Sequence, residues 1–84
     1  MGELNSVVFA VDRASAMPVF QQVYEGLRER IASGDFVSGS RLPPTRALAV
    51  ELGVSRSTIV TAYEQLVAEG YVEGRQGSGY AVCE

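Results

Sequence analysis

The side chains best suited to chemistry in this sequence are arginines and hydroxyls, which gather at two expected helix starts and one expected turn. A serine, an arginine, a second serine and a threonine follow one another at positions 55–58, and Arg46 and Arg75 occupy the other two places. Guanidinium groups bind phosphate through charge-assisted hydrogen bonds, and the backbone N–H groups and dipole of a helix start also favour an anion. This chemistry indicates a phosphate-bearing partner.

The residues that most enzymes and metal sites require are scarce. The chain has no histidine and a single cysteine, Cys83, so it lacks the commonest general base and the makings of a cysteine metal cluster. We therefore expect no enzyme activity, no metal and no cofactor in this chain. The hydrophobic content of 46% fits a packed core. No apolar stretch reaches the ~20 residues of a membrane span, and we expect a cytoplasmic protein.

The net charge of −3 and pI of about 4.8 oppose nucleic-acid binding at first sight. The position of the charges matters more than their sum. All seven basic residues are arginines, and three of them fall at the expected helix starts and the turn: Arg46, Arg56 and Arg75. Three acids fall in or beyond the second half of the later helix: Glu64, Glu69 and Glu73. We expect little long-range attraction but a locally positive face, and hence modest non-specific affinity.

The first half of the chain predicts a leader and one amphipathic helix. Residues 1–17 form the leader, in which the β-branched and apolar residues 7–11 favour a short extended segment. Pro18 suits the first position of a helix, and Gly34 suits its end. Between them, apolar residues recur at three- and four-residue steps: Phe20, Val23, Tyr24, Leu27 and Ile31. Residues 35–41 are expected to form a loop.

The second half predicts two helices joined by a tight turn, and then a hairpin. A helix over 45–52 ends at Gly53, and Ser55 caps a second helix that runs from Arg56 to about Glu69. The inward side of this second helix is expected to carry four residues: Ile59, Ala62, Tyr63 and Leu66. Two short strands, at residues 71–73 and 80–83, follow on either side of a glycine-rich tip.

These elements define the expected fold, which is mainly α with a small β-hairpin wing (α+β). It is a winged helix-turn-helix of three helices plus a two-stranded wing, occupying residues 18–84. An ordinary helical hairpin in a small all-α domain is the alternative, but it leaves the hairpin wing unexplained. The four tyrosines are expected to pack in the core and hairpin rather than to stack on bases.

Three stretches carry a resemblance to a known family: LPPTRALA, ELGVSRSTIVTAYEQLVAEGY and EGRQGSGYAV. Residues 18–82, about four-fifths of the chain, resemble the DNA-binding domain of GntR-type bacterial regulators. The AYEQL run, followed by EGY, is most similar to the MocR branch. The resemblance implies a transcription regulator, a repressor or an activator, that works as a homodimer on double-stranded DNA. It also implies a longer protein, with pyridoxal phosphate bound by a C-terminal aminotransferase-like domain outside this chain.

The resemblance, together with the helix-start chemistry, assigns a DNA-binding set. Family members contact DNA through the residue equivalent to Arg46 and place the wing tip near the minor groove, while Thr61 is expected to reach a base edge. The expected set is Thr45, Arg46, Ser55, Arg56, Ser57, Thr58, Thr61, Arg75, Gly77 and Ser78. The alternatives are a solvated surface arginine at 46, simple helix capping by Ser55, and a plain turn at the wing tip.

One departure from the family pattern affects base reading. Many GntR relatives carry arginine where this chain has Val60, so a bidentate guanine contact is not available there. A winged-helix module used for protein–protein association is the alternative function, and the acidic pI favours it mildly. Binding to duplex DNA that weakens steeply with salt would distinguish the two.

Overall fold

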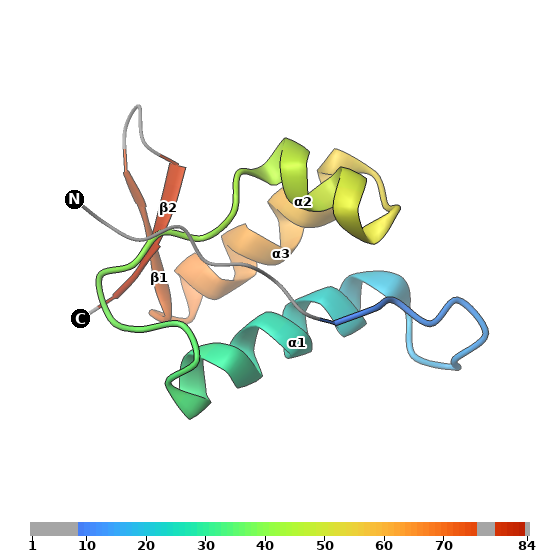
Figure 1. The fold of residues 1–84 in the computed structure, drawn as a ribbon, viewed down its shortest axis with the longest axis horizontal. Coiled ribbons are helices and arrows are strands. Elements are labelled where there is room, and N and C mark those ends of the chain that lie inside the picture. The colour runs from blue at the N-terminus through green and yellow to red at the C-terminus, as the bar shows by residue number, and fades with distance from the viewer. Residues whose placement is uncertain (1–8, 76–78, 84) are drawn as a thin grey trace.

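The structure is a computed structural model and describes residues 9–75 and 79–83. Five elements follow one another along the chain: α1 (Val19–Ser33), α2 (Thr45–Leu52), α3 (Arg56–Ala68), β1 (Val72–Arg75) and β2 (Gly79–Val82). Figure 1 shows α1 lying below α3, α2 lying above it, and the two strands at the left, beside the end of α3. This arrangement confirms the expected winged helix-turn-helix with three helices and a two-stranded wing.

The helix α1 begins one residue later than the sequence predicted. Pro18 has a helical φ of −57° but an extended ψ of 148°, so it precedes the helix rather than forming its first residue. Its carbonyl still accepts a hydrogen bond from the amide of Gln22 at 3.0 Å. Gly34 ends the helix with a φ of 87°, as predicted.

The turn between α2 and α3 has the expected boundaries. Gly53 adopts a left-handed conformation with φ 70° and ψ 35°, which a residue with a Cβ atom adopts only with strain. The amide of Val54 then donates to the carbonyl of Ala49 at 3.0 Å. Ser55 caps α3 by accepting a hydrogen bond from the amide of Thr58 at 3.2 Å. The helix ends at Ala68, one residue before the predicted end.

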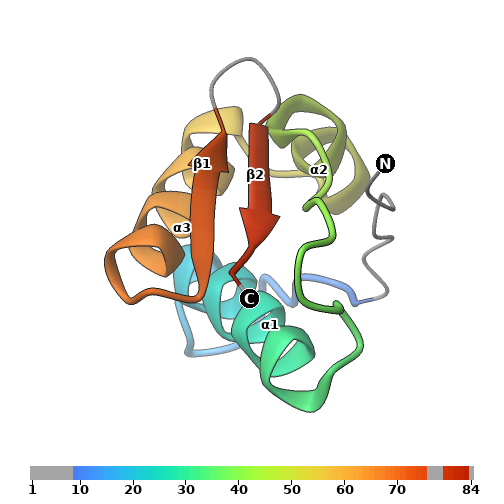
Figure 2. The ribbon, with the colours of Figure 1, turned by 90° about the vertical axis from the view of Figure 1, so that its left-hand side faces the viewer.

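The wing is an antiparallel pair in which Val72 lies opposite Val82 and Arg75 lies opposite Gly79. The predicted strands at 71–73 and 80–83 were displaced by one residue or more. The expected loop at 35–41 is also wrong at its end, since Arg41 forms a β-bridge with Ala81. Figure 2 shows the segment before α2 running beside β2. This segment satisfies backbone groups that the outer edge of β2 would otherwise expose.

The neighbouring hydrogen bonds make this third pairing more than a single bridge. The amide of Leu42 donates to the carbonyl of Tyr80 at 2.9 Å, and the amide of Val82 donates to the carbonyl of Ser40 at 2.8 Å. The approach to α2 is therefore attached to the wing as well as to the helices.

The core lies where α1, α2 and the wing meet α3. The predicted inward residues of α3 are all fully buried: Ile59, Ala62, Tyr63 and Leu66. Val23 and Leu27 from α1 and Leu48 from α2 are also fully buried, and Val72 and Val82 close the core from the wing. Each large aliphatic side chain removed from water contributes about 1.5–3 kcal/mol. No helix within the described ranges is long and apolar enough to cross a membrane.

The described part of the leader, residues 9–17, packs against α1 and forms no strand. The Phe9 ring lies so close to Gly26 that a Cβ atom there would be 2.9 Å from the ring, and the Arg30 guanidinium lies 4.8 Å from the ring centroid. The amide of Asp12 donates to the side chain of Gln22 at 2.8 Å. Residues 9–11 of the expected extended segment pair with no strand, and Phe9 and Val11 instead pack against the core. The remaining residues of that segment, Val7 and Val8, lie outside the described residues.

The left-handed turn predicts a specific stability difference between two glycines. Gly53→Ala should lower the free energy of unfolding by about 1–2 kcal/mol, because a Cβ atom strains a residue at positive φ even though nothing lies within 4 Å of it. Gly74→Ala, in β1, should change stability far less, because its Cβ would meet only Tyr80 at 4.0 Å. Thermal melting of both variants checks this; equal loss in both would contradict the role of the turn.

Candidate nucleic-acid interface

The starts of α2 and α3 come together on the surface. The Nε atom of Arg56 donates to the Oγ1 atom of Thr45 at 3.3 Å, so two residues eleven positions apart share one site. Thr45 is half-buried, whereas Arg46 and Arg56 are exposed. The sequence predicted each of these residues separately, and the structure shows that α2 and α3 place them beside one another.

The hydroxyls at the start of α3 form a compact group around Ser55. The Ser55 Oγ atom lies 2.9 Å from the Thr58 Oγ1 atom and 3.1 Å from the Ser57 Oγ atom, besides accepting the amide of Thr58. The capping role that the sequence offered as the alternative for Ser55 is therefore confirmed. The group is still open to water, since Ser55 and Ser57 are exposed, and its DNA-binding role stays a prediction.

Further along α3, the outward side is polar. Thr61 is exposed, while Val60 is half-buried beside the inward residues. Gln65 is also exposed, but its amide donates to Glu69 at 2.9 Å. Thr61 is therefore open to contact with a base edge, whereas the Gln65 amide already has a partner in Glu69.

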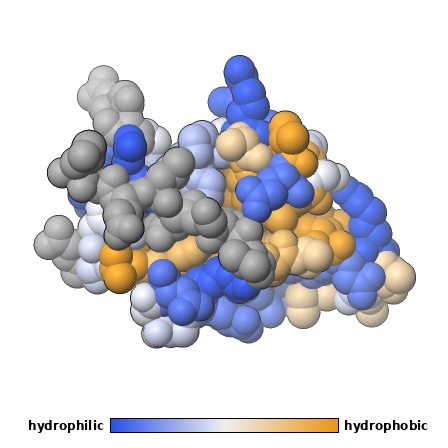
Figure 3. Space-filling view, in the orientation of Figure 1, coloured by the Kyte–Doolittle hydropathy of each residue, from blue (hydrophilic) through white to orange (hydrophobic). Residues whose placement is uncertain are grey.

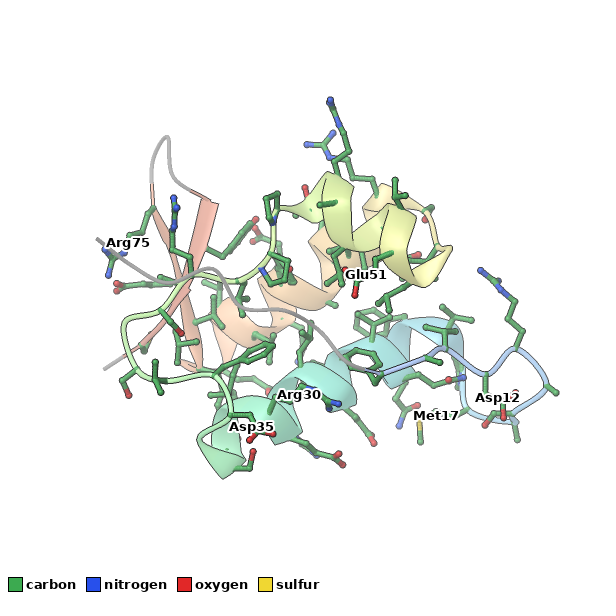
Figure 4. All side chains as sticks on the ribbon, in the orientation of Figure 1. Asp12, Met17, Arg30, Asp35, Glu51 and Arg75 are labelled. Atoms are coloured by element: carbon green, nitrogen blue, oxygen red, sulfur yellow. The ribbon has the colours of Figure 1, made fainter. Side chains whose placement is uncertain are left out.

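The wing presents one of the predicted residues within the described part of the chain. Arg75 ends β1 and forms an ion pair with Glu73, with 2.9 Å between Nη2 and Oε2 (Figure 4). Both side chains are about half exposed, and an exposed pair of this kind contributes about 0–1 kcal/mol, so it can open for another anion. The sequence did not predict this acidic partner. The predicted residues Gly77 and Ser78 lie outside the described residues.

Two tyrosines, Tyr63 and Tyr80, join α3 to the wing and to the segment before α2. Tyr63, fully buried on α3, donates its hydroxyl to the Pro43 carbonyl at 2.7 Å. The Tyr80 ring, on β2, meets the Tyr63 ring edge to face with centroids 5.0 Å apart, and the Tyr80 hydroxyl donates to Glu64 at 2.7 Å. The prediction that the tyrosines pack in the core and hairpin is confirmed. Their hydrogen bonds were missed, because residue spacing contains no signal for a hydroxyl meeting a distant carbonyl.

A third tyrosine acts at the opposite end of α3. The hydroxyl of Tyr24, on α1, donates to the Glu69 carboxylate, which lies just after the last residue of α3. This hydrogen bond lowers the pKa of Glu69 and raises the pKa of Tyr24. The Arg28 guanidinium lies 5.4 Å from the centre of the Tyr24 ring. This cluster joins α1 to the end of α3 and lies away from the two helix starts.

The leader reaches the turn between α2 and α3. Arg13 is exposed and donates a hydrogen bond to the carbonyl of Gly53. A cation at this position also interacts favourably with the carboxyl end of α2. Sequence reasoning missed this contact, since nothing in the local pattern of the leader indicates a partner forty residues away.

The surface above α2 is polar, and apolar surface lies next to it. Figure 3 shows hydrophilic residues projecting at the upper edge of the molecule and hydrophobic surface below them. Val50, on α2, is the most exposed large hydrophobic residue of the described chain, at 79%. Within that part of the chain, no group of three or more histidine, cysteine, aspartate or glutamate residues could hold a metal ion.

Comparison with known proteins gives consistent matches. Residues 20–82 match the family described as "Bacterial regulatory proteins, gntR family". The chain is 49% identical over 72 residues to the "Probable rhizopine catabolism regulatory protein MocR" of Rhizobium meliloti, covering 86% of this chain and 15% of that protein. The chain thus spans about one-seventh of the length of this curated relative.

Solved structures give the same result. YtrA from Sulfolobus acidocaldarius, a GntR-family transcription factor, superposes with a TM-score of 0.82 at 35% identity, covering 94% of this chain and 82% of that one. The DNA-binding domain of AraR, solved in complex with operator ORR3, superposes with a TM-score of 0.77 at 32% identity. This match covers 82% of this chain and 83% of that chain.

The buried phenol of Tyr63 predicts a loss of stability in alkaline solution. Burial raises the pKa of Tyr63, and hydrogen bonds to Glu64 and Glu69 raise the pKa values of Tyr80 and Tyr24. The unfolded chain therefore loses these protons first, so stability holds below about pH 10 and falls as the pH rises above it. Urea unfolding across this range should show a shallower fall for Tyr63→Phe than for the wild type. Equal slopes would contradict the burial of the phenol.

Proposed function

Because this chain belongs to the GntR family of bacterial regulatory proteins, we propose that it is the sequence-specific DNA-binding domain of a transcription regulator. The observation that carries the proposal is the hydrogen bond between Arg56 and Thr45. It marks the exposed site at which the packing of α2 on α3 places both helix starts, where two helix dipoles and two arginines, Arg46 and Arg56, can meet one phosphate backbone.

In this mechanism α3 enters the major groove of the duplex. Its capped start and Arg56 approach first, and Thr61 lies about one turn further along the exposed side, where it can contact a base edge. Val60 cannot form the bidentate contact with guanine that an arginine makes. Base reading therefore depends on short hydroxyls and on close approach of the helix.

Contacts to the backbone hold α3 in register. Arg46, from the first turn of α2, and Arg75, from the end of β1, are assigned to phosphates on either side of the groove. Arg75 exchanges Glu73 for a phosphate when the wing meets the backbone or the minor groove. The wing tip completes this contact through the predicted residues Gly77 and Ser78.

Two kinds of comparison support this mechanism. The DNA-binding domain of AraR has a similar fold over 82% of this chain, and its solved structure contains an operator. YtrA, a GntR-family transcription factor, and MocR, named as a probable regulatory protein of rhizopine catabolism, resemble the chain in sequence as well. With a net charge of −3, the domain gains little from long-range attraction, so affinity depends on the local contacts.

For the whole protein, we propose a cytoplasmic homodimer in which two such domains bind paired half-sites. The MocR-like sequence further supports a pyridoxal-phosphate-binding domain elsewhere in a longer protein. The 84 residues themselves do not fit that cofactor, because they include no lysine to form the Schiff base with it. The sequence of the parent gene after Glu84 tests this part of the proposal.

The second candidate function is a winged-helix module for protein association. The acidic pI and the exposed Val50 favour it. A protein partner would leave binding to duplex DNA weak and only slightly salt-dependent, whereas a DNA-binding domain loses affinity steeply as salt rises.

Truncating Arg56 should weaken DNA binding without unfolding the domain. Arg56→Ala removes charge and hydrogen bonds from an exposed side chain, so we expect roughly a ten- to hundredfold loss of affinity and a nearly unchanged melting temperature. The probe is a duplex that the wild-type chain has selected from a randomised pool, titrated at several salt concentrations.

Arg28→Ala is the matched control, because it removes the same charge from α1, beside Tyr24. It should leave affinity within about twofold of the wild type. Equal losses in the two variants would show that only overall charge matters, and no loss for Arg56→Ala would remove Arg56 from the interface.

A further inference from the structure

Tyr63 ties the middle of α3 to the approach of α2. Its side chain is fully buried, and its hydroxyl donates to the Pro43 carbonyl at 2.7 Å. Pro43 lies two residues before Thr45, the first residue of α2. A phenylalanine would fill the same space, so the hydroxyl contributes a directional hydrogen bond and not additional packing. Without that carbonyl, burying the hydroxyl would be unfavourable.

The hydrogen bond from Tyr63 acts just before a helix start that has no capping side chain of its own. Pro44 occupies the position before the helix and makes no side-chain hydrogen bond to it, whereas Ser55 fixes the start of α3. The side chains of Thr45 and Arg46 follow directly after Pro44. Besides the packing of α2 on α3, their place relative to α3 depends on how the segment at Pro43 and Pro44 is held.

Tyr80 joins the wing to Tyr63 and to the segment before α2. Its ring packs edge to face on Tyr63, and its hydroxyl donates to Glu64 of α3 at 2.7 Å. Its backbone carbonyl accepts the amide of Leu42 at 2.9 Å, next to Pro43. One pair of rings thus contacts α3, β2 and the approach to α2.

We propose that Tyr63 and Tyr80 form a positioning pair that sets the start of α2 and the wing at fixed places relative to α3. With that geometry, Arg46, Arg56 and Arg75 can engage one duplex at the same time. The inference rests on the proposed DNA binding and assigns a role to two residues outside the predicted DNA-binding set. Contacts that must be made together lose strength when the side chains that make them are free to move.

The test compares two changes of tyrosine to phenylalanine in the 84-residue chain. Tyr63→Phe removes the hydroxyl that reaches Pro43, and Tyr24→Phe removes a hydroxyl that joins α1 to Glu69 at the other end of α3. Affinity is measured for a duplex selected by the wild-type chain and for an unrelated duplex. Tyr63→Phe should reduce affinity for the selected duplex about five- to tenfold and lower its preference over the unrelated one. Tyr24→Phe should change neither.

A double-mutant cycle separates positioning from general stability. If Tyr63 acts by placing Arg46, then combining Tyr63→Phe with Arg46→Ala should cost less affinity than the product of the two separate losses. An affinity loss in the double variant equal to the product of the two single losses would contradict the proposal. In the free protein, hydrogen exchange at the amide of Leu48, which donates to the Pro44 carbonyl, should accelerate in Tyr63→Phe while the amides of α1 keep their rates.

The outcomes distinguish this inference from the proposed function. Wild-type chain that binds no duplex would overturn the proposed function, and with it the role of the pair in binding. If the wild-type chain binds and Tyr63→Phe binds equally well, with the same preference for the selected duplex, only the positioning role is overturned.

If Tyr63→Phe does not fold, Tyr80→Phe replaces it, because that change removes only the hydrogen bond from the partly exposed Tyr80 to Glu64. It should lower the preference for the selected duplex, and an unchanged preference would overturn the proposal.

Discussion

Burial of one side of α3 is the constraint on which the other elements depend. Ile59, Ala62, Tyr63 and Leu66 are fully buried, and α1, α2 and β1 all pack against the helix that carries them. Because this side is used for the core, the opposite side and the start of α3 face solvent. The packing that stabilises the domain therefore also selects the side chains that a partner can reach. A helix that carried the same residues in another register would expose its apolar side and bury Thr61.

The electrostatics of the domain are local. The chain is acidic overall, yet Arg46 and Arg56 lie at neighbouring helix starts whose dipoles also attract an anion. Two of the acids are held by tyrosines, Glu64 by Tyr80 and Glu69 by Tyr24, and Glu73 pairs with Arg75. Weak long-range attraction combined with a defined contact site favours discrimination over general adhesion to nucleic acid. Joining two domains would restore affinity through effective concentration.

Local signals predicted most of the fold, and long-range contacts account for the rest. The helix over 45–52, the turn at Gly53 and the cap at Ser55 follow from short-range patterns and were predicted at the correct residues. The wing was predicted, but its strands were displaced because alternation over four residues fixes a strand end poorly. The bridge at Arg41 and the contact of Arg13 with Gly53 were missed, since each joins segments about forty residues apart.

The same division holds for the candidate site. Chemistry at helix starts identified Arg46, Arg56 and the hydroxyls at 55–58, and the structure added their proximity through Thr45. The ion pair of Arg75 with Glu73 and the hydrogen bond of Tyr63 to Pro43 required three-dimensional packing. Gly77 and Ser78 lie outside the described residues, so their assignment stays a prediction.

DNA binding through this face is tested most directly by an NMR titration of the isotopically labelled chain with a duplex that it has selected. Amide shifts should concentrate at the first turns of α2 and α3, at Thr61 and along the wing, and the exposed side of α1 should stay unchanged. Shifts concentrated on α1, or spread evenly over the surface, would contradict the assignment of the DNA-binding face.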